Sequence, residues 1–250
     1  MEIGAQFFTL RDFCKDTESF SETLKRVAEI GYKTVQISGT CEFEPKLLKE
    51  ELKKNGLKCV LTHTPADKLQ NDPTRVAADH DAFDCKYVGL GWFGFSEEND
   101  GQHYDDFIRI YKPVANTLKQ NGKYFMHHNH DQEFQKYNGK LILHRLAEDF
   151  SPDEMGFTLD TFWVQAGGGD PAWWIERLSG RVPCIHLKDY AFGKKMAVIG
   201  EGNINFDRVF EKAESAGTKY MLVEQDNCNG EDPFDCLKRS YDFLRSRGFE

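Results

Sequence analysis

The chain has 250 residues, of which 40% are hydrophobic and 29% charged, so it can bury a substantial core and is not an intrinsically disordered chain. Its formal net charge of −9 disfavours nucleic acid as a partner, because an acidic surface repels phosphate groups. No apolar run approaches the ~20 residues that a membrane span needs, and Met1-Glu2-Ile3-Gly4 does not begin a signal peptide. The seven Cys form no CxxC pair, which indicates reduced thiols and predicts a cytoplasmic protein.

A local pattern recurs along the chain. An amphipathic helical stretch ends at a glycine, and a basic residue and a short apolar run follow it. The first copy has Gly31, Lys33 and the run 34–37, and similar runs follow Gly56, Gly122 and Gly217. A glycine after a helix is a common helix stop, and a short apolar run rich in Val and aromatic residues is typical of a strand buried on both faces.

Strands and helices are predicted to alternate throughout the chain. The predicted strands are residues 2–7, 33–37, 58–63, 86–91, 123–128, 156–160, 182–186 and 219–224. The predicted helices are residues 18–30, 45–55, 66–83, 103–121, 140–149, 171–179, 205–216 and 233–247. This alternation predicts an α/β fold in which residues 1–250 form a single domain, a (β/α)₈ TIM barrel with parallel strands. A doubly wound open sheet is the alternative, but no GxGxxG motif follows the first strand.

Polar residues follow nearly every predicted strand, whereas the strand interiors are apolar. The active site of a TIM barrel forms at the carboxyl ends of its strands, so these residues are the candidates for chemistry. They are Gln6, Gln36, His63, Trp92 and the runs 127–133, 160–163, 186–189 and 224–226.

Each of these residues also has a purely structural explanation. His63 and His186 are explained equally by hydrogen bonding at the barrel end, and Asp160 by capping of the next helix. Glu224 is harder to explain in this way, because a carboxylate that ends a buried strand must be paired or bound to a cation. An oxygen-rich set with one or two imidazoles suits Mn²⁺, and also Mg²⁺, Co²⁺ or Zn²⁺.

The second half of the chain resembles the xylose isomerase-like TIM-barrel family, whose members are broadly sugar phosphate isomerase/epimerase-like, and within it the branch with an HNHxxEF pattern. The matching stretches are HNHDQEF at 128–134, LDTFW at 159–163, AGGGDP at 166–171, HLKD at 186–189, GEGNINF at 200–206 and VEQD at 223–226.

The resemblance implies four metal ligands, which follow the fifth to the eighth strand. Asp160, His186 and Glu224 fit the last three positions directly. Ketose epimerases place the fifth-strand acid where this chain has Met126 and His127, whereas the HNHxxEF branch places it later. We therefore expect Glu133 as the fourth ligand, with His130 as its substitute.

The resemblance also implies the rest of the site. Gln6, His63, His128, Trp163 and Glu201 are expected to bind substrate. Trp163 departs from the family pattern, because epimerases often carry a substrate-binding His there. This departure weakens the transfer of the ordinary ketose-epimerase substrate to this chain.

The reaction implied is proton abstraction next to the carbonyl of a sugar or cyclic polyol, in which the divalent metal stabilises an enediolate. Glu133 and Glu224 are the expected acid and base, and His130 and Lys188 are the next candidates. The Lys188 side chain is equally explained by a structural ion pair at the barrel rim. The expected protein is an isomerase or epimerase without nucleic-acid or membrane partners, and homo-oligomers are common among such barrels.

Three other functions are considered. A keto-sugar lyase, deglycosidase or dehydratase is the first alternative, because the same enediolate can expel a neighbouring group. The second is a non-catalytic sugar-binding barrel, which predicts a disrupted ligand set. The third, a DNA-repair endonuclease of related fold, needs a basic groove that a chain of charge −9 does not favour.

Overall fold

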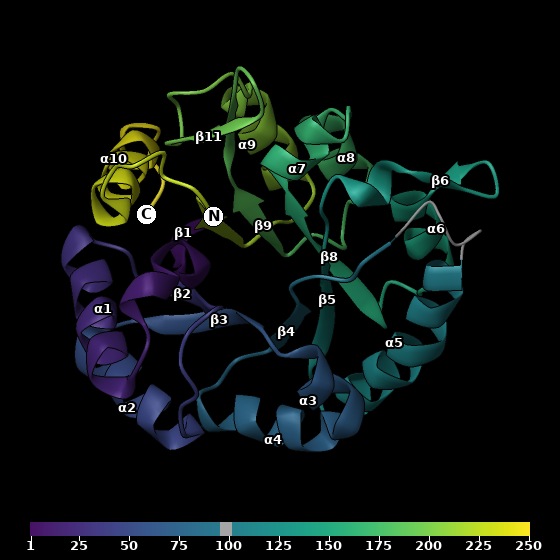
Figure 1. The fold of residues 1–250 in the computed structure, drawn as a ribbon, viewed down its shortest axis with the longest axis horizontal. Coiled ribbons are helices and arrows are strands. Elements are labelled where there is room, and N and C mark those ends of the chain that lie inside the picture. Colours follow the sequence, from purple (N-terminus) through teal and green to yellow (C-terminus); the bar gives the residue numbers. More distant parts are fainter. Residues whose placement is uncertain (96–101) are drawn as a thin grey trace.

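The structure, a computed structural model, describes residues 1–95 and 102–250, in which eight parallel strands close into a barrel (Figure 1). The barrel strands are β1 (Glu2–Gln6), β2 (Thr34–Ile37), β3 (Lys58–His63), β4 (Tyr87–Leu90), β5 (Tyr124–His128), β8 (Met155–Asp160), β9 (Cys184–Leu187) and β12 (Tyr220–Val223). The first strand pairs with both β2 and β12, so the sheet is closed. The predicted TIM barrel is therefore confirmed, and the open-sheet alternative is wrong.

Helices surround the strands on the outside of the barrel (Figure 1). They are α1 (Thr17–Ile30), α2 (Pro45–Asn55), α3 (Ala66–Asn71), α4 (Pro73–Ala82), α5 (Gln102–Gln120), α6 (Ile142–Asp149), α7 (Thr161–Ala166), α8 (Pro171–Arg177), α9 (Phe206–Ser215) and α10 (Pro233–Ser246). No helix in the described ranges is long and apolar enough to cross a membrane.

The helix predicted at 66–83 is two helices, α3 and α4. Pro73 has no backbone N–H and disfavours helical conformation in the residue before it, so the first helix ends at Asn71. The Asp72 side chain then accepts a hydrogen bond from the Arg75 N–H and caps the second helix. The break bends the chain at the mouth of the barrel.

Several short elements lie in the loops that follow the carboxyl ends of the barrel strands. They are the 3₁₀ helices η1 (Phe7–Phe13) and η3 (Gln132–Phe134) and two hairpins, β6 (Lys136–Tyr137) with β7 (Lys140–Leu141) and β10 (Asp189–Ala191) with β11 (Lys195–Ala197). The buried Asp189 carboxylate accepts hydrogen bonds from four backbone N–H groups, those of Tyr190, Gly200, Gly202 and Ile204. This one side chain therefore holds the loop after β11 in place.

The barrel interior is layered, with apolar side chains below and polar side chains at the mouth. Residues two apart on a strand point to the same side. Met126, Cys184 and Leu222 belong to an apolar cluster formed by the barrel strands. His128, His186 and Glu224 each come two residues later and are buried too. The alternation thus places one polar side chain directly above each apolar one.

Two glycines that end helices, Gly31 and Gly56, allow a test of how backbone conformation and nearby side chains limit the residue at a helix end. Gly31 has a φ of +124°, and a Cβ there would lie 2.5 Å from the Tyr241 ring, whereas Gly56 has a φ of +64° with no atom near its Cβ position. Alanine tolerates the second conformation at a cost of about 1 kcal/mol but not the first. We expect Gly31→Ala to lower the free energy of unfolding by at least about 2 kcal/mol and Gly56→Ala by about 1 kcal/mol, measured by denaturant titration. Equal losses would contradict the geometry at Gly31.

Candidate metal centre

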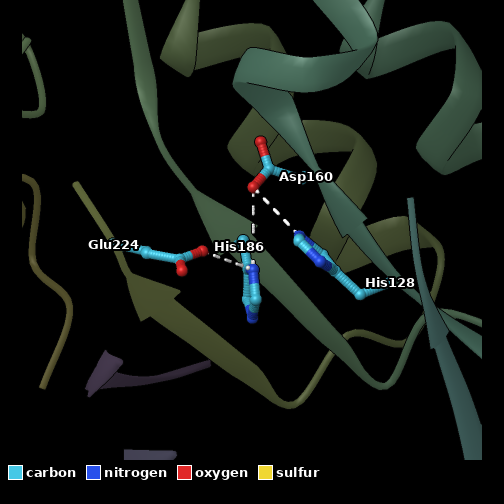
Figure 2. Close-up of side chains that lie close together, drawn as sticks. All are labelled: His128, Asp160, His186 and Glu224. Atoms are coloured by element: carbon cyan, nitrogen blue, oxygen red, sulfur yellow. Dashed lines mark hydrogen bonds and ion pairs between the residues drawn. The ribbon is translucent and has the colours of Figure 1, made fainter. Parts of the chain in front are cut away.

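Four buried side chains converge at the mouth of the barrel, each from the end of a different strand. They are His128 at the end of β5, Asp160 at the end of β8, His186 on β9 and Glu224 directly after β12, and one potential ligand atom of each lies within 4.8 Å of those of the others. Figure 2 shows Asp160 and Glu224 directed at His186, with His128 on the side of His186 opposite Glu224 and also in contact with Asp160. The strand register places Asp160 directly beside His186.

The separations between the ligand atoms suit a single divalent cation. Nδ1 of His186 lies 2.8 Å from Oε2 of Glu224 and 3.6 Å from Oδ2 of Asp160. Nε2 of His128 lies 3.2 Å from the same Asp160 oxygen. Ligands that bind one cation at about 2.0–2.3 Å are themselves roughly 3–4 Å apart. The four atoms therefore need little movement to bind one ion.

Hydrogen bonds to neighbouring groups determine which nitrogen of the His128 and His186 imidazoles faces the cluster. Nδ1 of His128 lies 3.0 Å from the carbonyl oxygen of Gly91, which can only accept, so Nδ1 carries the proton and Nε2 is free. Nε2 of His186 donates to Oε1 of Gln36 at 2.6 Å, so Nδ1 is the nitrogen that faces the cluster. Burial lowers the pKa of His186, but Glu224 and Asp160 raise it by more, and a metal ion bound at Nδ1 would replace its proton. Outer partners of this kind are a regular feature of histidine metal ligands.

Two buried atoms of the cluster lack a hydrogen bond, as expected for ligands of a cation. Nδ1 of His186 and Oε2 of Glu224 are close together, yet neither has a hydrogen-bond partner of acceptable geometry within the part of the chain that is described. Buried polar atoms without partners are rare because desolvation is costly. A divalent cation between them would satisfy both, so the residues present fit such an ion.

Lys188 balances the acidic charge of the site. Its buried ammonium lies 3.0 Å from Oδ2 of Asp160, 3.0 Å from Oε2 of Glu224 and 3.1 Å from Oδ2 of Asp226. Burial lowers the pKa of Lys188, but these three carboxylates raise it by more, and the net shift is upward. The lysine therefore remains charged and does not act as a base.

Both acidic ligands remain ionised. Burial raises the pKa of Asp160 and of Glu224, but Lys188 and the neighbouring imidazoles lower it by more, so both pKa values lie well below normal. Burial and Glu224 raise the pKa of Asp226 to about 7. Burial lowers the pKa of His63 and of His128, whose rings are 5.1 Å apart, so both imidazoles are neutral.

Glu133, the expected fourth ligand, lies outside this group, and that expectation is corrected. The chain turns back through η3, so that Oε2 of Glu133 accepts the backbone N–H of His130 at 2.9 Å, and Oε1 lies 2.9 Å from Nε2 of His127. With both oxygens used inside the loop, Glu133 is also not placed to act as an acid or base. His128, which we expected to bind substrate, takes the fourth position.

A cavity of about 440 Å³ opens above the cluster, and some of the other predicted site residues line it whereas others do not. His63, His130 and Lys188 line it, together with Asp226 and the half-exposed Trp92. The Trp163 ring packs against His130 with centroids 5.1 Å apart, at the edge of the site. We refer to this space below as the sugar cavity.

Two predicted substrate-binding residues do not line the sugar cavity. Gln6 lies behind Glu224 and donates to its Oε1 at 2.8 Å, so it positions that carboxylate. Glu201 forms an ion pair with Arg239 at the surface, with a separation of 2.9 Å, because Arg239 lies between two acidic side chains. Gln36 and Asp226 are among the residues at the ends of predicted strands, but no specific role was predicted for either of them from the sequence.

The family described as Xylose isomerase-like TIM barrel matches residues 24–247. An inosose dehydratase of Mesomycoplasma hyopneumoniae (strain J) is 25% identical, with 91% of this chain and 88% of that protein aligned. A solved sugar phosphate isomerase/epimerase from Parabacteroides distasonis is 22% identical, with a TM-score of 0.82 and coverage of 98% of this chain and 93% of that chain.

Two further solved structures share the fold. An L-ribulose 3-epimerase is 17% identical, covers 98% of this chain and 94% of its own, and has a TM-score of 0.78. A probable 3-DHS dehydratase from Bacillus anthracis is 15% identical, covers 99% and 100%, and has a TM-score of 0.73. The same fold therefore occurs in proteins named for two different reactions.

The two glutamates of the site differ in their expected effect on metal content. We expect Glu224→Gln to lose most of the bound Mn²⁺, because an amide does not replace an anionic ligand, and Glu133→Gln to retain it. Glu133→Gln is expected to lower the melting temperature, because it weakens the loop bonds to His127 and His130. Metal analysis after dialysis, with thermal unfolding of the same samples, measures both. Equal metal loss in the two variants would show that Glu133 is a ligand.

Lys188→Met tests the charge balance. Without metal, we expect the free energy of unfolding to fall by about 3–5 kcal/mol, because the buried carboxylates of Asp160 and Glu224 and the partly buried one of Asp226 lose the ammonium that they share. Added Mn²⁺ should then raise the melting temperature of the variant more than that of the wild type. Lys123→Met is the matched control, because buried Lys123 pairs with Asp81, outside the site. An equal response of both variants to metal would refute the role of Lys188.

Proposed function

Because this chain belongs to the xylose isomerase-like TIM barrel family, we propose that it is a divalent-metal-dependent isomerase or epimerase of a sugar or cyclic polyol. The reaction begins with removal of a proton next to the substrate carbonyl. The observation that carries the proposal is the buried set of His128, Asp160, His186 and Glu224 beneath an open cavity. A non-catalytic barrel has no need to bury four potential ligands, among which Nδ1 of His186 and Oε2 of Glu224 lack a hydrogen-bond partner within the described residues.

The donor set, two imidazoles and two carboxylates, suits Mn²⁺, with Zn²⁺, Co²⁺ and Mg²⁺ as alternatives. When bound, such an ion polarises the substrate carbonyl and makes the neighbouring C–H more acidic. The cavity borders the ligand group on the side of His128 and Glu224, which both line it. A substrate in the cavity therefore lies against the metal ligands.

Glu224 is the residue that we assign to proton removal. Gln6 holds one of its oxygens, and the other faces the cluster, so the carboxylate has a fixed orientation. The carboxylate is ionised, which is the form that accepts a proton. Lys188, 3.0 Å from the same carboxylate, supplies a positive charge close to the oxygen on which negative charge develops.

His130 is better suited to substrate binding than to proton transfer. Its ring lines the sugar cavity and lies 4.7 Å from the His128 ring. Burial, with smaller contributions from His128 and Lys188, lowers its pKa to about 2. A neutral imidazole of such weak basicity is a hydrogen-bonding group for substrate hydroxyls.

A second reaction, elimination of a neighbouring group by a lyase or dehydratase, is favoured by one observation. Epimerisation needs an acid or base on each face of the sugar ring, whereas elimination needs only one base. Within the described residues, Glu133 is engaged in its loop, and Asp160 caps the Trp163 N–H and contacts Lys188. Of the two carboxylates in the proposed ligand set, Glu224 lines the sugar cavity and Asp160 does not, so Glu224 is the one placed for proton transfer. Several relatives are also named dehydratases.

Deuterium exchange tests both reactions. We expect the Mn²⁺-loaded protein in D₂O, with a panel of ketoses, inososes and 3-keto-glucosides, to place deuterium at one carbon next to the carbonyl, followed by NMR. An epimerised or isomerised sugar supports the first reaction, and an unsaturated product with release of the leaving group supports the second. Glu224→Gln should reduce exchange by ~10²-fold or more. Full metal occupancy without exchange in any substrate would refute the proposal.

A further inference from the structure

A second cavity lies beside the sugar cavity, between the carboxyl ends of β2 and β3 and helix α4. Its volume is about 250 Å³, and the proton-abstraction reaction gives it no role. Most of its wall is apolar and comes from Ile37, Phe43, Pro45, Pro65, Val76 and Phe83. We call this space the apolar cavity.

The two cavities share a wall. Ser38, Gly39, His63, Thr64 and Pro65 line both of them. The wall is thin at Gly39, which has a φ of +66° and whose absent Cβ would lie 2.8 Å from the Phe8 ring in the sugar cavity. The two cavities therefore adjoin at this wall, against which the Phe8 ring packs.

His63 stands at the junction with one nitrogen available. Its Nδ1 lies 3.0 Å from Oγ of Ser38, and its buried Nε2 has no hydrogen-bond partner within the described ranges. A ligand that spans both cavities has a polar linking atom at this point. A hydrogen bond from His63 to such an atom would satisfy a nitrogen that is otherwise buried without a partner.

Contacts with neighbouring residues fix the side chains that bound the apolar cavity. Such fixed walls favour a binding site that exists before the ligand arrives. Phe43 stacks on Phe20, with ring centroids 5.7 Å apart. His80 bonds to Thr62 at 2.8 Å and to the Val76 carbonyl at 2.7 Å, which ties β3 to α4 behind the cavity. Concave sites with apolar walls and a few placed polar groups are typical of small-molecule binding.

We propose that the apolar cavity binds an aromatic ring carried on the sugar, so that the substrate is an aryl glycoside whose sugar ring bears a keto group. This proposal rests on the proposed function, because it takes the sugar cavity as the site of the reacting ring. The ring of the substituent packs among Phe43, Val76 and Phe83, and His63 binds the oxygen that joins it to the sugar.

The experiment compares binding of three probes to the Mn²⁺-loaded protein. The probes are 4-fluorophenol, followed by ¹⁹F NMR, and methyl and phenyl 3-keto-β-D-glucopyranoside, followed by calorimetry. Val76→Phe fills the apolar cavity, and Thr40→Trp fills it from the loop if the first variant does not fold. Val209→Phe is the matched control, because Val209 is a buried helical valine that lines a different cavity, between α8 and α9.

We expect the phenyl glycoside to bind the wild type and Val209→Phe at least about tenfold more tightly than the methyl glycoside, because burial of a ring is favourable. In Val76→Phe this preference and the binding of 4-fluorophenol should both be lost, with methyl glycoside binding unchanged. Unchanged binding of 4-fluorophenol to the filled variant would overturn the proposal, as would a phenyl glycoside that binds no better than the methyl one.

The binding experiment tests the apolar cavity separately from the proton-abstraction reaction. Binding does not require turnover, so an aryl preference that Val76→Phe removes would support the apolar cavity even if no deuterium is exchanged. Proton exchange without an aryl preference would leave the proposed function standing and overturn the subsite.

Discussion

Asp160, Glu224 and Asp226 lie together at the mouth of the barrel, and all three contact the single ammonium of Lys188. Burying several carboxylates is costly unless positive charge is supplied close by. The ammonium of Lys188 does not neutralise both Asp160 and Glu224, and Asp226, whose pKa is about 7, adds negative charge as the pH rises. This excess negative charge, and the imidazole nitrogens of His128 and His186 that face it, suit a divalent cation.

A layer of neutral groups behind the ligands fixes their directions. The Gly91 carbonyl, Gln36 and Gln6 each bond to one ligand on the side away from the cluster. The Asn129 side chain accepts the backbone N–H of Asp160 and so holds the end of β8. None of these groups carries charge, so they orient the ligands without changing the charge balance that Lys188 maintains.

The reaction and the substrate depend on different parts of the barrel mouth. The strands β5, β8, β9 and β12 supply the four potential ligands, which in the proposed reaction act on the carbonyl and its neighbouring C–H. The ends of β2 and β3, with α4, supply His63 and the apolar cavity, which lie where a substituent of the sugar would extend. A change in the second group can therefore alter substrate choice without disturbing the first.

The amino-acid sequence alone predicts the barrel, the end of it that carries the chemistry, and the convergence of Asp160, His186 and Glu224. These inferences succeed because they depend on strand order, and every parallel strand of a barrel brings its carboxyl end to the same mouth. His128 also follows from strand alternation, since it lies two residues beyond the inward-facing Met126, whereas His127 packs against Phe107 outside the barrel.

The position of Glu133 depends on tertiary structure. Four residues separate it from His128, and only the turn of η3 decides whether its carboxylate enters the cluster or folds back onto the His130 N–H. Glu201 likewise leaves the site because Arg239, distant in sequence, attracts it. Loop conformation and contacts between distant segments are set by packing, because no local pattern of residues encodes which partner a flexible acidic side chain will meet.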